Sequence, residues 1–171
     1  MIQLDISRIK NNPGEEQRLV TNFRMEPIQS GHDRVFFNNP LRLDVFLVND
    51  GGALKLGGFL EADVKVACSR CLELFDMPVR AEMDEVYYNE SQQDVEPGED
   101  WVPFRGDNLN ITPEVEKALL SSLPMKLLCR QDCRGLCQKC GTNLNRGDCD
   151  CLVDNIDPRL EVLKKLLEKE N

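Results

Sequence analysis

The cysteines of this chain are closely spaced and gathered in two places. Six of the eight lie in the stretch CRQDCRGLCQKCGTNLNRGDCDC, residues 129–151, and the other two, Cys68 and Cys71, lie upstream in VACSRCLELF. Cysteines separated by two residues can place both thiolates on one ion, which is typical of structural metal sites. The spacing therefore predicts metal binding.

The C-terminal cysteines predict one closed four-sulfur site. Cys137 and Cys140 form a C-x-x-C pair followed by Gly141, whose backbone freedom suits the tight turn of a zinc knuckle. Cys149 and Cys151 supply a second close pair. A disulfide is disfavoured here, because a one-residue gap would close a strained ring. Iron in a rubredoxin-like site suits the same ligands, but zinc is favoured.

The four remaining cysteines predict a second site. Cys68 and Cys71 lie at an expected turn between strands, and Cys129 and Cys133 follow an expected helix. Because eight cysteines make two sets of four ligands, these four are expected to bind a second ion, which would join the C-terminal segment to the sheet. Exchange of ligands between the two groups, with Cys133 replacing another cysteine, stays open. The sequence thus predicts two Zn²⁺ ions per chain.

The elements that must position these sulfurs begin with a predicted β domain at residues 1–88. Apolar and polar residues alternate in LRLDVFLV, ALKLGGFLEADVKVAC and FDMPVRAEMDEVYY, and NDGG at residues 49–52 predicts a hairpin turn. Gly57 and Gly58 indicate a bulge or bend in the second run. We expect an antiparallel sheet that curls into a barrel or a sandwich.

Residues 89–110 are predicted to be an acidic linker. From Glu82 to Asp100 there are eight acidic residues and no basic one, and the segment is broken by a Pro-Gly pair. Such a composition is typical of a solvated spacer. Trp101 and Phe104 are expected to anchor its end to the sheet.

Residues 111–171 are predicted to form a helical, cysteine-rich zinc module, which makes the fold class α+β. Thr112 is the expected N-cap of a first helix with Pro113 at its first position, and Pro124 is the expected stop. A last helix is expected from Asp157 onward, with an apolar face that packs against the domain. The apolar faces of the two helices consist of Val115, Leu119, Leu120 and Leu123, and of Leu160, Leu163, Leu166 and Leu167.

Composition favours a cytoplasmic protein without catalytic activity. The 171 residues include 30% charged and 41% hydrophobic residues, and we find neither a secretory signal nor a membrane-spanning run. In a reducing compartment eight cysteines favour metal ligation over disulfides. The single histidine, His32, is expected in a solvated loop, and no nucleophile–base or phosphate-loop pattern is found. A thiol-redox centre is disfavoured, because CSRC lies between expected strands instead of at a helix N-terminus.

The segments CSRC with LELF, LPMKLLC, CRGLCQKCGTNLN, CDC and IDPRL resemble the YceD family, the large ribosomal RNA subunit accumulation proteins. The resemblance runs from about residue 40 to the C-terminus. It implies a role in the synthesis, processing or stability of large-subunit (23S) ribosomal RNA, and so in ribosome assembly. The competing hypothesis is a zinc-ribbon adaptor for another machine, such as transcription.

The net charge disfavours an RNA partner, whereas the local distribution of basic residues allows one. The formal net charge is −9, and two four-thiolate zinc sites would take it to about −13, which should repel a phosphate backbone. Residues 124–147, however, carry five basic residues and one acidic residue. These cations could contact RNA or a ribosomal protein, or could simply offset the thiolates. The candidate contact residues are Lys126, Arg130, Arg134, Lys139 and Arg146.

Overall fold

The computed structural model describes residues 1–30, 33–91 and 96–151. Within these ranges the chain forms nine strands, one short 3-10 helix and one α-helix. In chain order the elements are β1 (Gln3–Asp5), η1 (Ile9–Asn11), β2 (Glu16–Phe23), β3 (Ile28–Ser30), β4 (Asp33–Phe37), β5 (Leu41–Asn49), β6 (Leu54–Ala67), β7 (Leu74–Asn89), β8 (Val102–Phe104), β9 (Asn108–Asn110) and α1 (Thr112–Ser122).

The main sheet has seven strands and is mostly antiparallel, as predicted. The long strands β6 and β7 pair along their whole shared length, and β6 pairs on its other side first with β5 and then with β4. β2 lies beyond β5, β3 beyond β4, and β8 pairs with β7 in parallel. The sheet does not close into a barrel, one of the two predicted forms, since no described strand joins β2 to β8.

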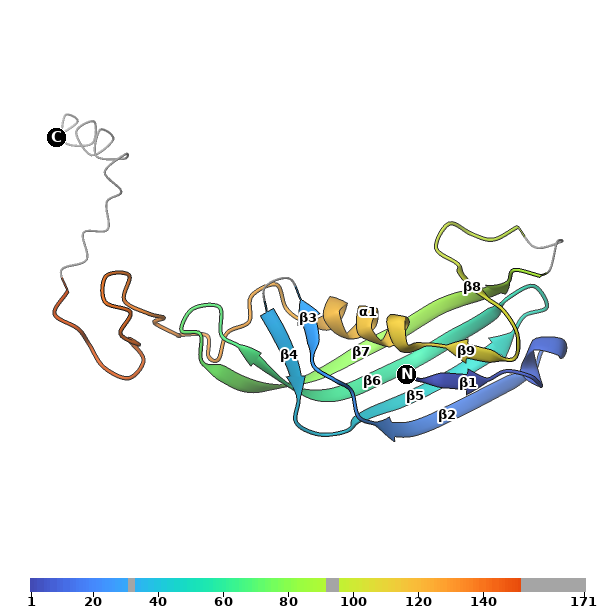
Figure 1. Cartoon of the computed structure of the whole chain (residues 1–171), viewed down its shortest axis with the longest axis horizontal. Helices are drawn as coiled ribbons and strands as arrows, with labels where there is room; N and C mark the ends of the chain where they lie inside the picture. The colour runs from blue at the N-terminus through green and yellow to red at the C-terminus, as the bar shows by residue number, and fades with distance from the viewer. Residues whose placement is uncertain (31–32, 92–95, 152–171) are drawn as a thin grey trace, which may run out of the picture.

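One face of this sheet is buried beneath α1 and a small sheet formed by β1 and β9. Figure 1 shows α1 and this two-stranded sheet lying across the long strands. The alternation of apolar residues correctly predicted which side chains face this layer, because neighbouring side chains of a strand point to opposite faces. Buried members of this core include Leu41, Leu43, Val45, Leu56, Leu60, Val64, Ala81, Val115 and Leu119.

Gly57 and Gly58 do not form a bulge, which was one of the two predicted features. The pairing of β6 with β5 and with β7 continues through both residues without an inserted position. The glycines instead allow close approach between strands. A Cβ atom on Gly58, whose φ is +144°, would lie 2.3 Å from the carbonyl oxygen of Asp44, and a Cβ atom on Gly57 would lie 2.5 Å from the ring of Phe46.

The start of α1 also differs from the prediction. The N-cap is Ile111, and no side chain caps the helix. The hydroxyl of Thr112 accepts a hydrogen bond from the backbone N–H of Ile2 at 2.7 Å, so it ties the residue before β1 to the helix. At the other end Leu123 has extended backbone angles, as expected for the residue before Pro124.

The segment predicted as a linker, residues 89–110, contains β8 and β9. Phe104 is buried in the core, and β9 pairs with β1 at the start of the chain. Together with α1, these contacts extend the core of the sheet beyond the predicted boundary at residue 88. The expected last helix and His32 lie outside the described residues. None of the described helices is long and apolar enough to cross a membrane.

Candidate metal centres

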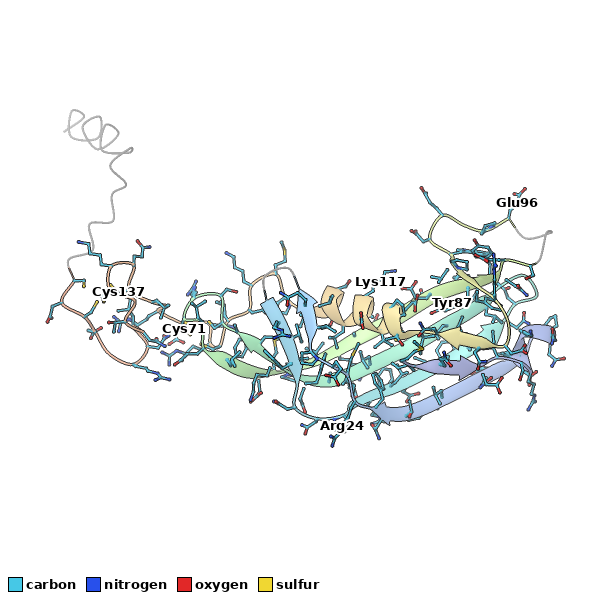
Figure 2. All side chains as sticks on the ribbon, in the orientation of Figure 1. Arg24, Cys71, Tyr87, Glu96, Lys117 and Cys137 are labelled. Atoms are coloured by element: carbon cyan, nitrogen blue, oxygen red, sulfur yellow. The ribbon has the colours of Figure 1, made fainter. Side chains whose placement is uncertain are left out.

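The first group of cysteines, Cys68, Cys71, Cys129 and Cys133, forms at the end of the long β6–β7 hairpin. Their four sulfurs lie within 4.8 Å of one another, although the two pairs are about sixty residues apart in sequence. The segment after α1 reaches the hairpin through a hydrogen bond from the Ser69 N–H to the Leu127 carbonyl at 2.7 Å. Figure 2 shows Cys71 at this end of the sheet.

The sulfur separations in the first group suit one tetrahedral ion. The Sγ atoms of Cys68 and Cys133 lie 3.8 Å apart, and those of Cys71 and Cys129 lie 3.7 Å apart. A tetrahedral ion bound to sulfurs at about 2.3 Å would require separations of about 3.8 Å. A disulfide would require a far shorter distance of about 2.05 Å, and all eight cysteines are free.

The second group, Cys137, Cys140, Cys149 and Cys151, lies farther out along the chain. Its four sulfurs also lie within 4.8 Å of one another. This group is less protected than the first: Cys140 is exposed and Cys149 and Cys151 are half-buried, whereas three cysteines of the first group are buried. In Figure 2 Cys137 lies beyond Cys71, toward the outer end of the molecule.

Each group contains one knuckle with the same backbone hydrogen bond. The N–H of Leu72 donates to the Cys68 carbonyl at 2.9 Å, and the N–H of Gly141 donates to the Cys137 carbonyl at 2.9 Å. Both donors have positive φ, 61° for Leu72 and 75° for Gly141. The knuckles therefore place the C-x-x-C sulfurs in the same way, one with the expected glycine and the other with a leucine.

Backbone N–H groups favour a thiolate in the first group. Burial is the largest influence on the pKa of Cys68 and raises it, but the N–H groups of Cys129, Cys71 and Arg70 together outweigh burial and lower this pKa to about 6. Burial and the neighbouring sulfurs raise the pKa of Cys129 to about 12. The Cys68 sulfur thus ionises readily, whereas Cys129 keeps its proton because burial and, secondarily, the neighbouring sulfurs disfavour a second negative charge. A divalent cation would relieve that repulsion and displace the protons.

The second group shows the same division. The hydroxyl of Thr142, 3.1 Å from the sulfur of Cys140, is the largest of several influences that lower the pKa of Cys140 to about 6. Contact with the Cys140 sulfur is the largest influence on Cys151 and raises its pKa to about 12. Each group therefore has the donors and the charge pattern to hold one metal ion, and neither shows a built-in preference among thiophilic metals.

The five predicted contact cations have different surroundings. The three arginines face acceptors: Arg130 lies 3.6 Å from Asp132, Arg134 lies 2.7 Å from Asp148, and Arg146 pairs with Glu73. Lys126 and Lys139 are exposed and have no ion pair with any described residue. The arginines are thus matched by carboxylates, an outcome that neither sequence hypothesis anticipated.

The family model of the large ribosomal RNA subunit accumulation protein YceD matches residues 56–167, which is more than half of the chain. The chain belongs to the YceD family. The matched segment includes nearly all of the β6–β7 hairpin and all eight cysteines. The family resemblance predicted from the sequence is therefore confirmed.

Relatives of this YceD-family chain include a protein of the plant Arabidopsis thaliana and proteins of mycobacteria. It is 25% identical over 159 residues to "Large ribosomal RNA subunit accumulation protein YCED homolog 1, chloroplastic" of Arabidopsis thaliana, which covers 76% of the chain and 49% of that protein. It is 28% identical over 186 residues to an uncharacterized protein of Mycobacterium tuberculosis, covering 98% of the chain and 82% of that protein. The chain thus spans about half the length of the Arabidopsis relative. No solved structure matches it.

The structure brings the eight cysteines together in the two sets that their spacing and number predicted, and their role as ligands stays a prediction. Two residues near the sulfurs were missed. Leu72 occupies the position that is glycine in the other knuckle, and no sequence pattern predicts a leucine there. Asn145 donates to a sulfur of the first group at 3.3 Å. The pattern TNLN between two cysteine pairs was a signal for Asn145, because asparagine often organises turns.

Proposed function

We propose that this protein is a non-catalytic factor in large-subunit ribosome biogenesis, which supports the synthesis, processing or stability of large-subunit ribosomal RNA. The observation that carries the proposal is the family match over residues 56–167, which includes both cysteine groups. The Arabidopsis relative that is named as an accumulation protein adds support.

Each cysteine group is proposed to hold one zinc ion. Support comes from the sulfur separations of 3.7 and 3.8 Å in the first group and from the closed set of four sulfurs in each. An ion in the first group would join the β6–β7 hairpin to the segment after α1. An ion in the second group would close the loop between Cys140 and Cys149.

A structural role for these ions supports the proposal of a non-catalytic protein. Catalytic zinc uses three protein ligands and keeps one position open for water or substrate. Here four sulfurs converge in each group, so a tetrahedral ion would have no open position. The ions would then act by fixing the shape of the surface that meets a partner.

The proposed partner is large-subunit ribosomal RNA or a ribosomal assembly intermediate, contacted directly or through a protein. The acidic net charge of −9 disfavours a broad contact with the phosphate backbone. Lys126 and Lys139 are the two candidate cations without a carboxylate partner among the described residues, so they are the residues with charge to offer RNA. The arginines would instead hold the loops that carry the sulfurs.

Cells depleted of the protein test this proposal. We expect large-subunit RNA to fall relative to small-subunit RNA, and we expect the wild-type gene to restore the ratio. Cys71→Ser, at matched expression, should restore it poorly, whereas Asn39→Ala on an exposed loop should restore it fully. An unchanged ratio after depletion would defeat the proposal.

Crosslinking in growing cells identifies the partner. Recovery of large-subunit RNA would indicate direct contact, and recovery of ribosomal proteins or assembly factors from precursor particles would indicate a protein-mediated role. Recovery of RNA polymerase without ribosomal precursors would instead support the zinc-ribbon adaptor.

A further inference from the structure

The side chain of Asn145 lies where the two cysteine groups meet. Asn145 belongs to the loop between Cys140 and Cys149 of the second group, yet its Nδ2 atom lies 3.3 Å from the Sγ atom of Cys133 in the first group. The Asn145 residue is half-buried and Cys133 is buried, so the contact is largely shielded from water.

The contacts of Asn145 identify which amide atom faces the sulfur. Its Oδ1 atom accepts hydrogen bonds from the backbone N–H of Arg134 at 2.8 Å and from the guanidinium of Arg130 at 2.7 Å. Two N–H donors around one atom require that atom to be the oxygen. The Nδ2 atom also donates to Oδ1 of Asn143 at 2.9 Å, which fixes the plane of the amide.

A hydrogen bond to a metal-bound sulfur affects how firmly the ion is held. A thiolate carries negative charge, so a donor aimed at it forms a charge-assisted hydrogen bond. Outer hydrogen-bond partners of this kind orient the ligands, and their loss typically weakens metal affinity by about 10–100-fold. Asn145 therefore has the position of an outer partner of the first group.

The loop that carries Asn145 is closed by the second group. Two backbone hydrogen bonds tie this loop to the residues before it: the Cys137 N–H donates to the Thr142 carbonyl at 2.8 Å, and the Leu144 N–H donates to the Gly135 carbonyl at 2.9 Å. An ion shared by the cysteines at both ends of this loop would restrict its motion. With an ion in the second group, Asn145 would already be ordered beside Cys133, so the first group would lose less conformational entropy when it binds its ion.

We propose that Asn145 is a positioning residue that donates to the Cys133 thiolate and couples the two cysteine groups, so that metal in the second group tightens metal in the first. This inference rests on the metal binding proposed above. Because coupling between two binding sites is reciprocal, metal in the first group tightens metal in the second by the same factor.

Asn145→Asp tests the donor with little change of shape. The substitution keeps the oxygen that faces Arg134 and Arg130, but replaces the donor at Cys133 with a second acceptor. Asn143→Asp is the matched control, because it adds the same charge two residues away and keeps the oxygen that accepts from Asn145. Metal affinity of the full chain is measured by competition between cadmium or zinc and a chelator, with far-UV circular dichroism as a check of folding.

We expect Asn145→Asp to weaken the first group by about 10–100-fold, and Asn143→Asp to change it by less than about threefold. Cadmium NMR should show one of two resonances shifted in Asn145→Asp, since the electron density on the Cys133 sulfur changes. Asn145→Ser, which lacks the negative charge, should weaken the first group to a smaller extent. Equal affinities and unshifted resonances in all three variants would overturn the role of Asn145.

The coupling is tested by emptying the second group with Cys149→Ser and Cys151→Ser together. This double change should weaken the first group in the wild-type background and have little further effect in the Asn145→Asp background. The same loss in both backgrounds would show that another contact carries the coupling, and no loss in either would show that the groups are independent. A wild-type chain that binds no metal would defeat the proposed metal binding itself, which is a different failure from two bound ions without coupling.

Discussion

Leu72 and Gly141 occupy the same position in two knuckles of this protein. Each follows the second cysteine of a C-x-x-C pair, each donates its N–H to the first cysteine's carbonyl at 2.9 Å, and each has positive φ. Glycine adopts that conformation without steric cost, whereas a residue with a Cβ atom does not. Leu72 is also 67% exposed, so burial of its side chain offsets little of the conformational cost.

Replacing Leu72 with glycine is therefore expected to stabilise the fold. Relief of the left-handed backbone is worth about 1–2 kcal/mol, and the greater freedom of glycine in the unfolded chain takes back about 0.4–1 kcal/mol. The free energy of unfolding should rise by about 0.5–1 kcal/mol, measured by urea denaturation at a fixed zinc concentration. Leu74→Gly is the control: it is also exposed but lies in β7, and should lower stability. A destabilised Leu72→Gly would show that the leucine side chain makes a contact that matters more than its backbone.

Gly58→Ala is expected to disrupt the pairing of β5 with β6. The added Cβ would lie 2.3 Å from the Asp44 carbonyl oxygen, and φ of +144° is itself unfavourable for alanine. Both backbones are held in the centre of the sheet, so we expect a loss of about 2–4 kcal/mol in the free energy of unfolding. Gly52→Ala, where a Cβ meets nothing within 4 Å, should change it by less than about 0.5 kcal/mol. Similar values for the two variants would contradict the close-approach argument.

Elemental analysis of protein purified without added metal should find two zinc ions per chain. The two groups of four sulfurs motivate this number. Cys71→Ser should lower the content by about one ion. One ion in the wild type would show that only one of the two cysteine groups binds metal. Iron in place of zinc would favour the rubredoxin-like alternative.

The Arg18–Asp44 pair on the outer face of the sheet predicts a pH dependence. Two hydrogen bonds of 2.9 Å join the guanidinium to the carboxylate, and this contact holds the pKa of Asp44 below its ordinary value. Because the folded-state pKa is lowered, the stabilisation is fully present above the ordinary carboxyl pKa of about 3.9 and is lost as pH falls through the lowered value.

Urea denaturation of the wild type and Asp44→Asn checks this prediction. The wild type should be more stable at neutral pH, and the difference should shrink as the pH falls below about 4. Acid also releases metal from cysteine sites, but this occurs in both proteins and cancels in the comparison. Asp63→Asn, on the same face, provides the charge-matched control. A difference between wild type and Asp44→Asn that stays constant down to pH 2 would exclude the ion pair as its cause.

Local patterns in the sequence determined the strand faces and the C-x-x-C pairs. Leu41, Leu43 and Val45 alternate with polar residues because side chains of a strand point to opposite faces, and the structure buries all three. Cysteine spacing is similarly local, since a two-residue gap keeps both cysteines within one turn of the chain, where their sulfurs can reach the same ion. The grouping of Cys68 and Cys71 with a distant pair could be predicted from the sequence only because eight cysteines divide into two sets of four.

Other features depended on contacts between distant segments. The hydroxyl of Thr112 accepts from Ile2 across 110 residues, so its helix-cap signal was overridden. Gly58 and Asp44 meet only because β5 and β6 pair in one register, and a glycine in a strand pattern does not distinguish a bulge from close approach. The contact between Asn145 and Cys133 likewise joins residues of two different cysteine groups, and it exists only when the segment between them is folded. Periodicity and spacing reflect interactions between residues that are close in the chain, so they predict strand faces and cysteine pairs. Tertiary packing decides which distant atom pairs with a given donor or acceptor.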